Sequence, residues 1–196
     1  MDLDPKELID QAQEAKKERL NAAVAITVAA LATFMGICKV KDDNIVQAMQ
    51  QAQADKLDYW AYFQARTIRA DVAEQAATQL ELARGAAPAA QAADYDKAIA
   101  SYRAKYADQL KKRDELKALA ETAQSNYETL NRRDDQFDLS DALLAIAIAL
   151  LAVTALTQLW PLYFVALVPT VFGVVMGLAG LADLPIHPNA LFRLLS

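Results

Sequence analysis

Three long stretches of this sequence contain no charged residue, and they decide most of what the chain can fold into. They cover residues 20–38, 142–160 and 162–182 and consist mainly of Ala, Leu, Val and Ile. A hydrocarbon core about 30 Å thick is crossed by about 20 helical residues, each rising about 1.5 Å. The sequence therefore predicts one transmembrane helix at 20–38 and a transmembrane hairpin within 141–182, which turns at Trp160-Pro161.

The first apolar stretch follows a charged N-terminal tail, residues 1–19, that ends in the letters KKER. Such a flank also occurs in secretory signal peptides, and the triplet Ala30-Leu31-Ala32 allows cleavage. However, the apolar run is longer than an ordinary signal core and continues past Ala32. We therefore expect an uncleaved membrane anchor. At the other end of the chain, residues 183–196 form a C-terminal tail.

The region between the first and second apolar stretches, residues 39–140, is polar and rich in good helix formers such as Ala, Gln, Glu, Lys and Arg. Its only Gly and only Pro fall in RGAAPAAQAAD, residues 84–94. Because Gly and Pro interrupt helices, this single break splits the region into two helices. The sequence predicts an all-α fold with a long antiparallel helical hairpin whose tip lies near 84–94. The second polar helix either runs directly into the second span or restarts at Asp138 or Ser140, which the letters FDLSDALL offer as caps.

Both predicted helices carry a stripe of mostly apolar residues at alternating spacings of three and four, which is the coiled-coil pattern. Nine of eleven stripe positions are apolar in the first helix and ten of thirteen in the second. The positions are 45, 49, 52, 56, 59, 63, 66, 70, 73, 77 and 80, and 95, 99, 102, 106, 109, 113, 116, 120, 123, 127, 130, 134 and 137. Since two helices of this length bury little, we expect several copies to bundle into a homo-oligomer.

An aromatic group lies in the middle of the first polar helix: Tyr59, Trp60, Tyr62 and Phe63. Tyr59 and Phe63 fall on the predicted stripe, whereas Trp60 and Tyr62 do not and need another surface. A contact with another subunit or a partner protein is one interpretation of these residues. A ligand-binding aromatic box and simple exposure remain alternatives.

Carboxylates gather at the ends of the apolar stretches, and they are the residues best suited to carry chemistry. Asp42 and Asp43 follow the first span, and Asp134, Asp135 and Asp138 precede the second. In an oligomer they would form an acidic vestibule of the kind that attracts cations to a channel mouth. The alternative interpretation is that helix ends leaving a membrane simply need solvated residues.

Small residues in the third span, Gly173 and Gly177, have the spacing that lets two transmembrane helices approach closely. They are a candidate interface between subunits or within one subunit. Cys38 and His187 are the only cysteine and histidine, so a metal site built from them is not expected. No phosphate loop or catalytic triad order is present, and we expect neither an enzyme nor a cofactor. Acids and bases are mixed along the chain at a net charge of −5, so nucleic acid is not an expected partner.

Two quoted segments carry a family resemblance: DKLDYWAYFQARTIRADVAE at residues 55–74, and QFDLSDALLAIAIAL at residues 136–150. Together with the order of the apolar stretches, they resemble the bacterial membrane family called domain of unknown function 4337. The resemblance implies a multi-pass protein of the bacterial inner membrane. That family carries no established activity, so the resemblance supplies no catalytic residues. Members often have basic residues in the last turn, whereas TQLWPLYF has none here.

The count of Lys and Arg beside the spans does not decide the orientation, because four lie in the N-terminal tail and four lie at the two ends of the polar region. With the resemblance, we expect a cytoplasmic N-terminus and a periplasmic arm. The function expected is that of a non-enzymatic, homo-oligomeric scaffold or docking stalk. The partners expected are further copies and membrane lipid, and the arm offers a surface on which another protein could dock. The alternative is a cation channel or channel-like pore with an acidic vestibule.

Overall fold

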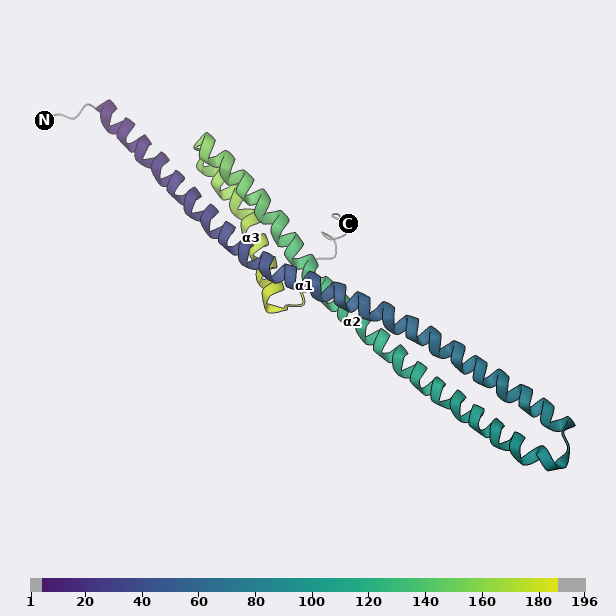
Figure 1. Cartoon of the computed structure of the whole chain (residues 1–196). Helices are drawn as coiled ribbons and strands as arrows, with labels where there is room; N and C mark the ends of the chain where they lie inside the picture. The colour runs from purple at the N-terminus through teal and green to yellow at the C-terminus, as the bar shows by residue number, and fades with distance from the viewer. Residues whose placement is uncertain (1–4, 187–196) are drawn as a thin grey trace. The chain divides into compact units, whose positions relative to one another are not determined.

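A computed structural model describes residues 5–186, and within this range the fold is all-helical, as predicted (Figure 1). The elements in order are α1 (Pro5–Ala86), the short 3-10 helix η1 (Ala89–Gln91), α2 (Ala92–Thr157) and α3 (Trp160–Ala182). Most of the predicted N-terminal tail is thus the beginning of α1. The end of the predicted C-terminal tail, including His187, lies outside the described residues.

α1, α2 and α3 are each long and apolar enough to cross a membrane, judged by length and composition. The prediction of three such helices is confirmed. α1 continues for 82 residues, because Gly and Pro are absent between Gly36 and Gly85. α2 likewise continues for 66 residues through Asp138 and Ser140, so the helix does not restart there.

The break between α1 and α2 falls within the predicted range 84–94. After α1 ends at Ala86, the amide of Ala87 donates to the carbonyl oxygen of Arg84. Pro88 follows with φ of −58° and ψ of 148°, an extended conformation that a helix cannot contain. Since proline also lacks the amide hydrogen that a helix interior uses, the chain must leave α1 at this point.

The turn between α2 and α3 lies earlier than Trp160-Pro161, where we placed it. Gln158 has a φ of 58°, and Leu159 is extended with φ of −100° and ψ of 110°. Trp160 and Pro161 instead begin α3. Proline suits the first turn of a helix, because its missing amide hydrogen would have no partner there and its φ is already helical.

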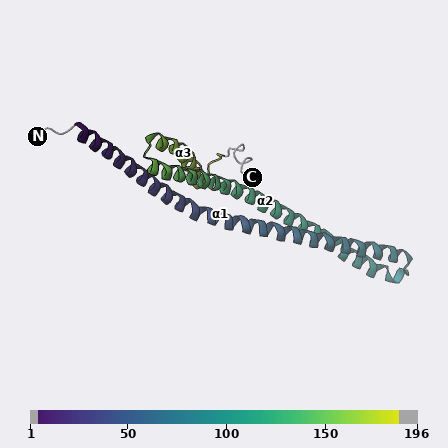
Figure 2. The same ribbon diagram turned by 90° about the horizontal axis from the view of Figure 1, so that it is seen from above.

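Contacts divide the chain into two compact units, and α1 and α2 contribute to both. The terminal unit comprises the described residues up to 47 and from 130 onward. Its core joins all three helices and consists of Leu20, Val24, Leu31, Leu144, Ala147, Leu151 and Ala166. α3 lies beside the C-terminal part of α2 (Figure 2). Other large apolar side chains of this unit face outward, among them Ile26, Leu156, Phe164 and Phe172.

The middle unit comprises residues 48–129. Its seven buried residues are Ala52, Ala70, Ala73, Ala77, Ile99, Ala120 and Ala123, and all seven belong to the predicted stripes. Polar contacts also connect its two helices: Arg84 pairs with Asp96, Arg103 with Glu81, and Arg66 donates to Gln109 at 3.0 Å. The packing of this unit therefore rests mainly on alanine.

Candidate functional site

Three of the predicted carboxylates, Asp42, Asp134 and Asp138, interact within the terminal unit, and we call them the acidic cluster. α1 contributes Asp42, while Asp134 and Asp138 lie one turn apart on α2. Asp42 is buried, with 5% of its surface exposed. Lys39 Nζ donates to Asp42 Oδ2 at 2.8 Å and lies 3.4 Å from Oδ1 of the exposed Asp43. The Lys39 ammonium is thus shared between Asp42 and Asp43, and the described contacts give Asp134 and Asp138 no cation of their own at this distance.

A small cavity of about 30 Å³ adjoins the acidic cluster. It is lined by residues of α1 and α2, namely Met35, Cys38, Lys39, Asp42, Phe137, Asp138, Ser140 and Asp141. A space of this size holds about one water molecule. Asp42 Oδ1 is buried and has no hydrogen-bond donor in the structure. The cavity is therefore polar on one side and too small for an organic substrate.

The surroundings of the acidic cluster favour protonation. Burial, then the hydrogen bond with Asp42 and the charges of nearby carboxylates, raise the pKa of Asp134 to about 6. Burial and the charge of Asp42 also raise the pKa of Asp138, against an opposing effect of Lys39. The hydrogen bond with Asp42 raises the pKa of Lys39 above its usual range, so Lys39 stays charged. Carboxyl pKa values raised by burial together with a specific charged neighbour occur often at functional sites.

Within residues 5–186, no group of three or more His, Cys, Asp or Glu side chains has the arrangement of a metal site. The lysine ammonium instead supplies the charge that faces Asp42. Asp135, also predicted as part of the vestibule, accepts a long hydrogen bond of 3.5 Å from Asn131. The carboxylates singled out from the sequence thus have different surroundings, and Asp42 and Asp134 are the pair that α1 and α2 bring together.

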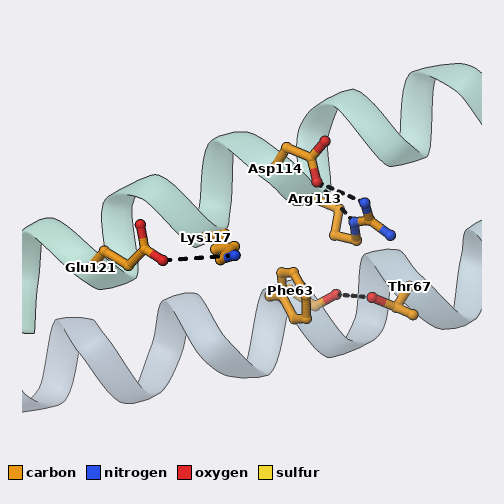
Figure 3. A network of polar contacts seen from close by, with 6 residues as sticks. All are labelled: Phe63, Thr67, Arg113, Asp114, Lys117 and Glu121. Carbon is orange, nitrogen blue, oxygen red and sulfur yellow. Dashed lines mark hydrogen bonds and ion pairs between the residues drawn. The ribbon is translucent and has the colours of Figure 1, made fainter.

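The aromatic group lies in the middle unit, and Figure 3 shows one of its members, Phe63, between α1 and α2. The rings of Trp60 and Phe63 meet edge to face at a centroid distance of 5.3 Å. The guanidinium of Arg113, on α2, lies 5.9 Å from the Phe63 ring centroid and is held from the other side by Asp114 at 2.8 Å. These contacts connect α1 and α2 within the unit through a cation–π interaction.

The two tyrosines of the aromatic group have different surroundings. Tyr59 is half-buried and lines an open groove together with Asp55, Leu119 and Asn126. Tyr62 is 60% exposed. The groove that Tyr59 lines does not include Trp60, Tyr62 or Phe63.

Gly173 and Gly177 pack against side chains of their own chain. A Cβ atom on Gly173 would lie 2.8 Å from Leu144, and one on Gly177 would lie 2.7 Å from the ring of Phe34. A Cβ atom on Gly180 would lie 2.9 Å from the ring of Phe137. The close approach that these glycines permit is therefore used within the terminal unit, where α3 meets α1 and α2.

Several polar contacts of the terminal unit were not foreseen from the sequence. Ser140 Oγ donates to the carbonyl oxygen of Gly173 at 2.8 Å, which explains why Ser140 does not cap a new helix. Gln136 is buried, and its amide donates to the carbonyl oxygens of Leu184 and Ile186 at 2.8 and 2.6 Å. The only sequence signal was that polar residues precede an apolar run, and that signal does not identify partners far along the chain.

A second surface of the middle unit was also missed, and we call it the outer stripe: Leu57, Ile68, Val72 and Leu82 of α1. These side chains are 60%, 62%, 60% and 74% exposed. At about 100° per residue they lie within roughly 80° of one another, on the side of α1 opposite the buried alanines. α1 thus buries small residues and exposes branched aliphatic ones in this unit.

These features define a class of protein: an all-α chain with three helices able to cross a membrane and a polar helical region between the first two. The chain belongs to the family described as Domain of unknown function (DUF4337), whose model matches residues 20–183. The resemblance carried by residues 55–74 and 136–150 is thereby confirmed. Comparisons with curated proteins and with solved structures gave no match.

Proposed function

We propose that this chain is a non-enzymatic, homo-oligomeric membrane scaffold whose middle unit forms an arm that bundles with the arms of other copies. The observation that carries the proposal is the outer stripe, four exposed aliphatic side chains on one face of α1. Fully burying such a side chain contributes about 1.5–3 kcal/mol. Contiguous exposed apolar surface marks protein–protein interaction sites, and Ile68 and Val72 lie one helical turn apart on this face.

The proposed arm is an antiparallel helical hairpin. Contact pairs between its helices support this arrangement, because residue numbers on α2 rise as those on α1 fall. The pairs are Arg84 with Asp96, Glu81 with Arg103, Arg66 with Gln109, and Phe63 with Arg113. A seam of alanines lets two helices pack closely but buries little apolar area. A second layer of contacts with other copies would stabilise such an arm.

The terminal unit is proposed to anchor the arm in a bacterial inner membrane, with the N-terminus in the cytoplasm. Its outward-facing apolar side chains, such as Leu156 at 85% exposure and Phe172 at 61%, suit contact with lipid. Membrane insertion gives every copy the same orientation. The outer stripe of one copy then meets the same stripe of another at the same height, which favours a second copy over a foreign protein as the occupant.

The test is native mass spectrometry of the full chain in lipid nanodiscs. We expect the wild type to be an oligomer and the double variant Ile68→Gln, Val72→Gln to associate at least tenfold more weakly, a loss of about 1.4 kcal/mol. The matched control is Leu119→Gln, which changes an exposed leucine on α2 of the same unit and should leave the particle mass unchanged. A monomeric wild type, or a stripe variant that associates normally, would contradict the proposal.

The alternative function, a cation channel, draws on the predicted acidic vestibule beside the apolar segments, in which Asp43 and Asp138 are exposed and Asp134 and Asp135 are half-buried. In an oligomer these could surround a pore entrance. Cation flux into liposomes that falls when Asp134, Asp135 and Asp138 become Asn would favour this alternative. The scaffold proposal expects no flux in either protein.

A further inference from the structure

The acidic cluster contains an acceptor whose hydrogen bonding is incomplete. Only 5% of the surface of Asp42 is exposed, and Lys39 binds its Oδ2 atom alone. Asp42 Oδ1 is equally removed from solvent but has no donor. A buried carboxylate oxygen without a donor is unfavourable. A hydrogen-bond donor next to Asp42 Oδ1 would therefore stabilise the unit, and an ionised carboxylate cannot be that donor.

The group next to Asp42 that could supply this hydrogen is the half-buried carboxyl of Asp134, which lies within hydrogen-bonding reach. An ionised carboxylate is an acceptor only, whereas a protonated one carries an O–H donor. Two adjacent carboxyls in a poorly solvated place avoid mutual repulsion by holding one proton between them. The contact between Asp42 and Asp134 is therefore favourable only when the pair is protonated once.

We propose that Asp42 and Asp134 form a proton-binding carboxyl pair that joins α1 to α2 in the terminal unit. The pair takes one proton from water, held on Asp134 and donated to Asp42 Oδ1. Its charge changes from −2 to −1. This proposal is independent of the oligomeric scaffold, since both carboxyls belong to one chain and one unit.

The other charged groups around the pair fit this assignment. On α1, the Lys39 ammonium binds Asp42 Oδ2 and lies 3.4 Å from Asp43 Oδ1, and it makes no hydrogen bond with Asp42 Oδ1. On α2, Arg133 donates to the carbonyl oxygen of Gly180 at 3.0 Å and pairs with Asp183 at 3.4 Å. The charges of Asp135 and Asp138, also on α2, favour proton uptake by Asp134.

A route for the proton exists beside Asp42. The cavity of about 30 Å³ is lined by Asp42 and by the exposed carboxylates Asp138 and Asp141. One water molecule in it could bring a proton from the surface to the pair. A metal cation at Asp42 would be repelled by the Lys39 ammonium, which already neutralises Oδ2 of that carboxylate. A proton shared with Asp134 at Oδ1 carries no such cost, because it forms a hydrogen bond there.

The direction of the pH effect follows from the raised pKa of Asp134, about 6 against a usual value of 3.8. A folded state that binds the proton more tightly than the unfolded chain gains stability at low pH. This stabilisation is complete below about pH 4 and is lost as the pH rises through about 6. The wild-type melting temperature should therefore fall across that window.

The test uses the full chain in nanodiscs and records infrared difference spectra of the protonated carboxyl band as the pH is lowered. We expect a band that titrates near pH 6 in the wild type and is lost in Asp134→Asn. In Asp42→Asn the band should titrate lower by at least half a pH unit, because the neighbouring charge is gone. Asp43→Asn is the matched control, an exposed carboxylate on the same lysine, and should keep the band.

Thermal unfolding gives a second readout. Asp134→Asn should melt a few degrees higher than the wild type at about pH 8 and lose the fall between about pH 4 and 7, whereas Asp43→Asn keeps it. The proposal is overturned if the wild type has no carboxyl titrating above about pH 5, or if the band persists in Asp134→Asn. Should that variant fail to fold, the wild-type titration and Asp42→Asn still decide the question.

Discussion

The two units of this chain are built from the same two long helices but packed in opposite ways. The terminal unit places large side chains such as Leu144 and Leu151 fully inside and lets three helices meet at Gly173 and Gly177. The middle unit buries six alanines and one isoleucine and leaves its branched aliphatic residues outside. A core of alanines buries much less apolar area per residue than one of leucines.

The two units therefore depend on different contacts for their stability. The terminal unit packs large side chains within one chain and joins its helices by hydrogen bonds such as that from Ser140 to Gly173. The middle unit relies on exposed ion pairs, each of little value in water, and on a stripe without a partner in the chain. We expect its stability to depend on other copies, and that of the terminal unit to depend on its own side chains.

The largest effect is expected where helices of the terminal unit approach most closely. In Gly173→Ala, the new Cβ atom would lie 2.8 Å from the fully buried Leu144 and 3.2 Å from Leu143. Overpacking of this kind costs about 1–3 kcal/mol, because the neighbours cannot move away. The loss should appear in the free energy of unfolding of the full chain in detergent micelles, measured by circular dichroism.

The matched control for this prediction is Gly36→Ala on α1. No atom lies within 4 Å of a Cβ at this position. Alanine also favours a helix over glycine by up to about 1 kcal/mol, so the variant should be as stable as the wild type or slightly more stable. If both variants lose stability equally, the close packing of the terminal unit is not what holds it together.

The smallest effect is expected from an ion pair of the middle unit. Arg84→Ala removes the pairing with Asp96, where both side chains are about half exposed. Water and salt screen such a pair, so we expect no measurable change in melting temperature at physiological ionic strength. A fall as large as that of Gly173→Ala would mean that surface charges, rather than contacts between copies, stabilise this unit.

Much of the fold could be predicted because the responsible signals are local. The three helices able to cross a membrane follow from uncharged stretches of sufficient length, and the break at 84–94 follows from Gly85 and Pro88. The buried alanines occupy predicted positions because a repeat of three and four residues tracks one helix face. Whether α2 continues through Ser140 could not be decided from the sequence, because a serine before an apolar run is also typical of a helix cap. In the structure its hydroxyl instead donates to the distant carbonyl oxygen of Gly173.

The site could be predicted less well, because it depends on which residues meet across helices. Asp42 and Asp43 are equivalent neighbours in the sequence, yet one is buried and the other exposed. The outer stripe was missed because its members are spaced by eleven, four and ten residues, a pattern that the stronger alanine-rich stripe obscures. Gln136 was missed because its partners, Leu184 and Ile186, lie beyond α3.

The most direct test of the account is disulfide cross-linking at the outer stripe. Cys38 is the only cysteine, so Cys38→Ala gives a background without thiols in which Ile68→Cys places one thiol on the stripe. Stripes that meet at equal height bring the two thiols within disulfide range, a Cα separation below about 7 Å. Oxidation in membranes should then give a covalent dimer, whereas Lys111→Cys, exposed on α2, should stay monomeric. Absence of the dimer at position 68, or equal cross-linking at position 111, would contradict the account.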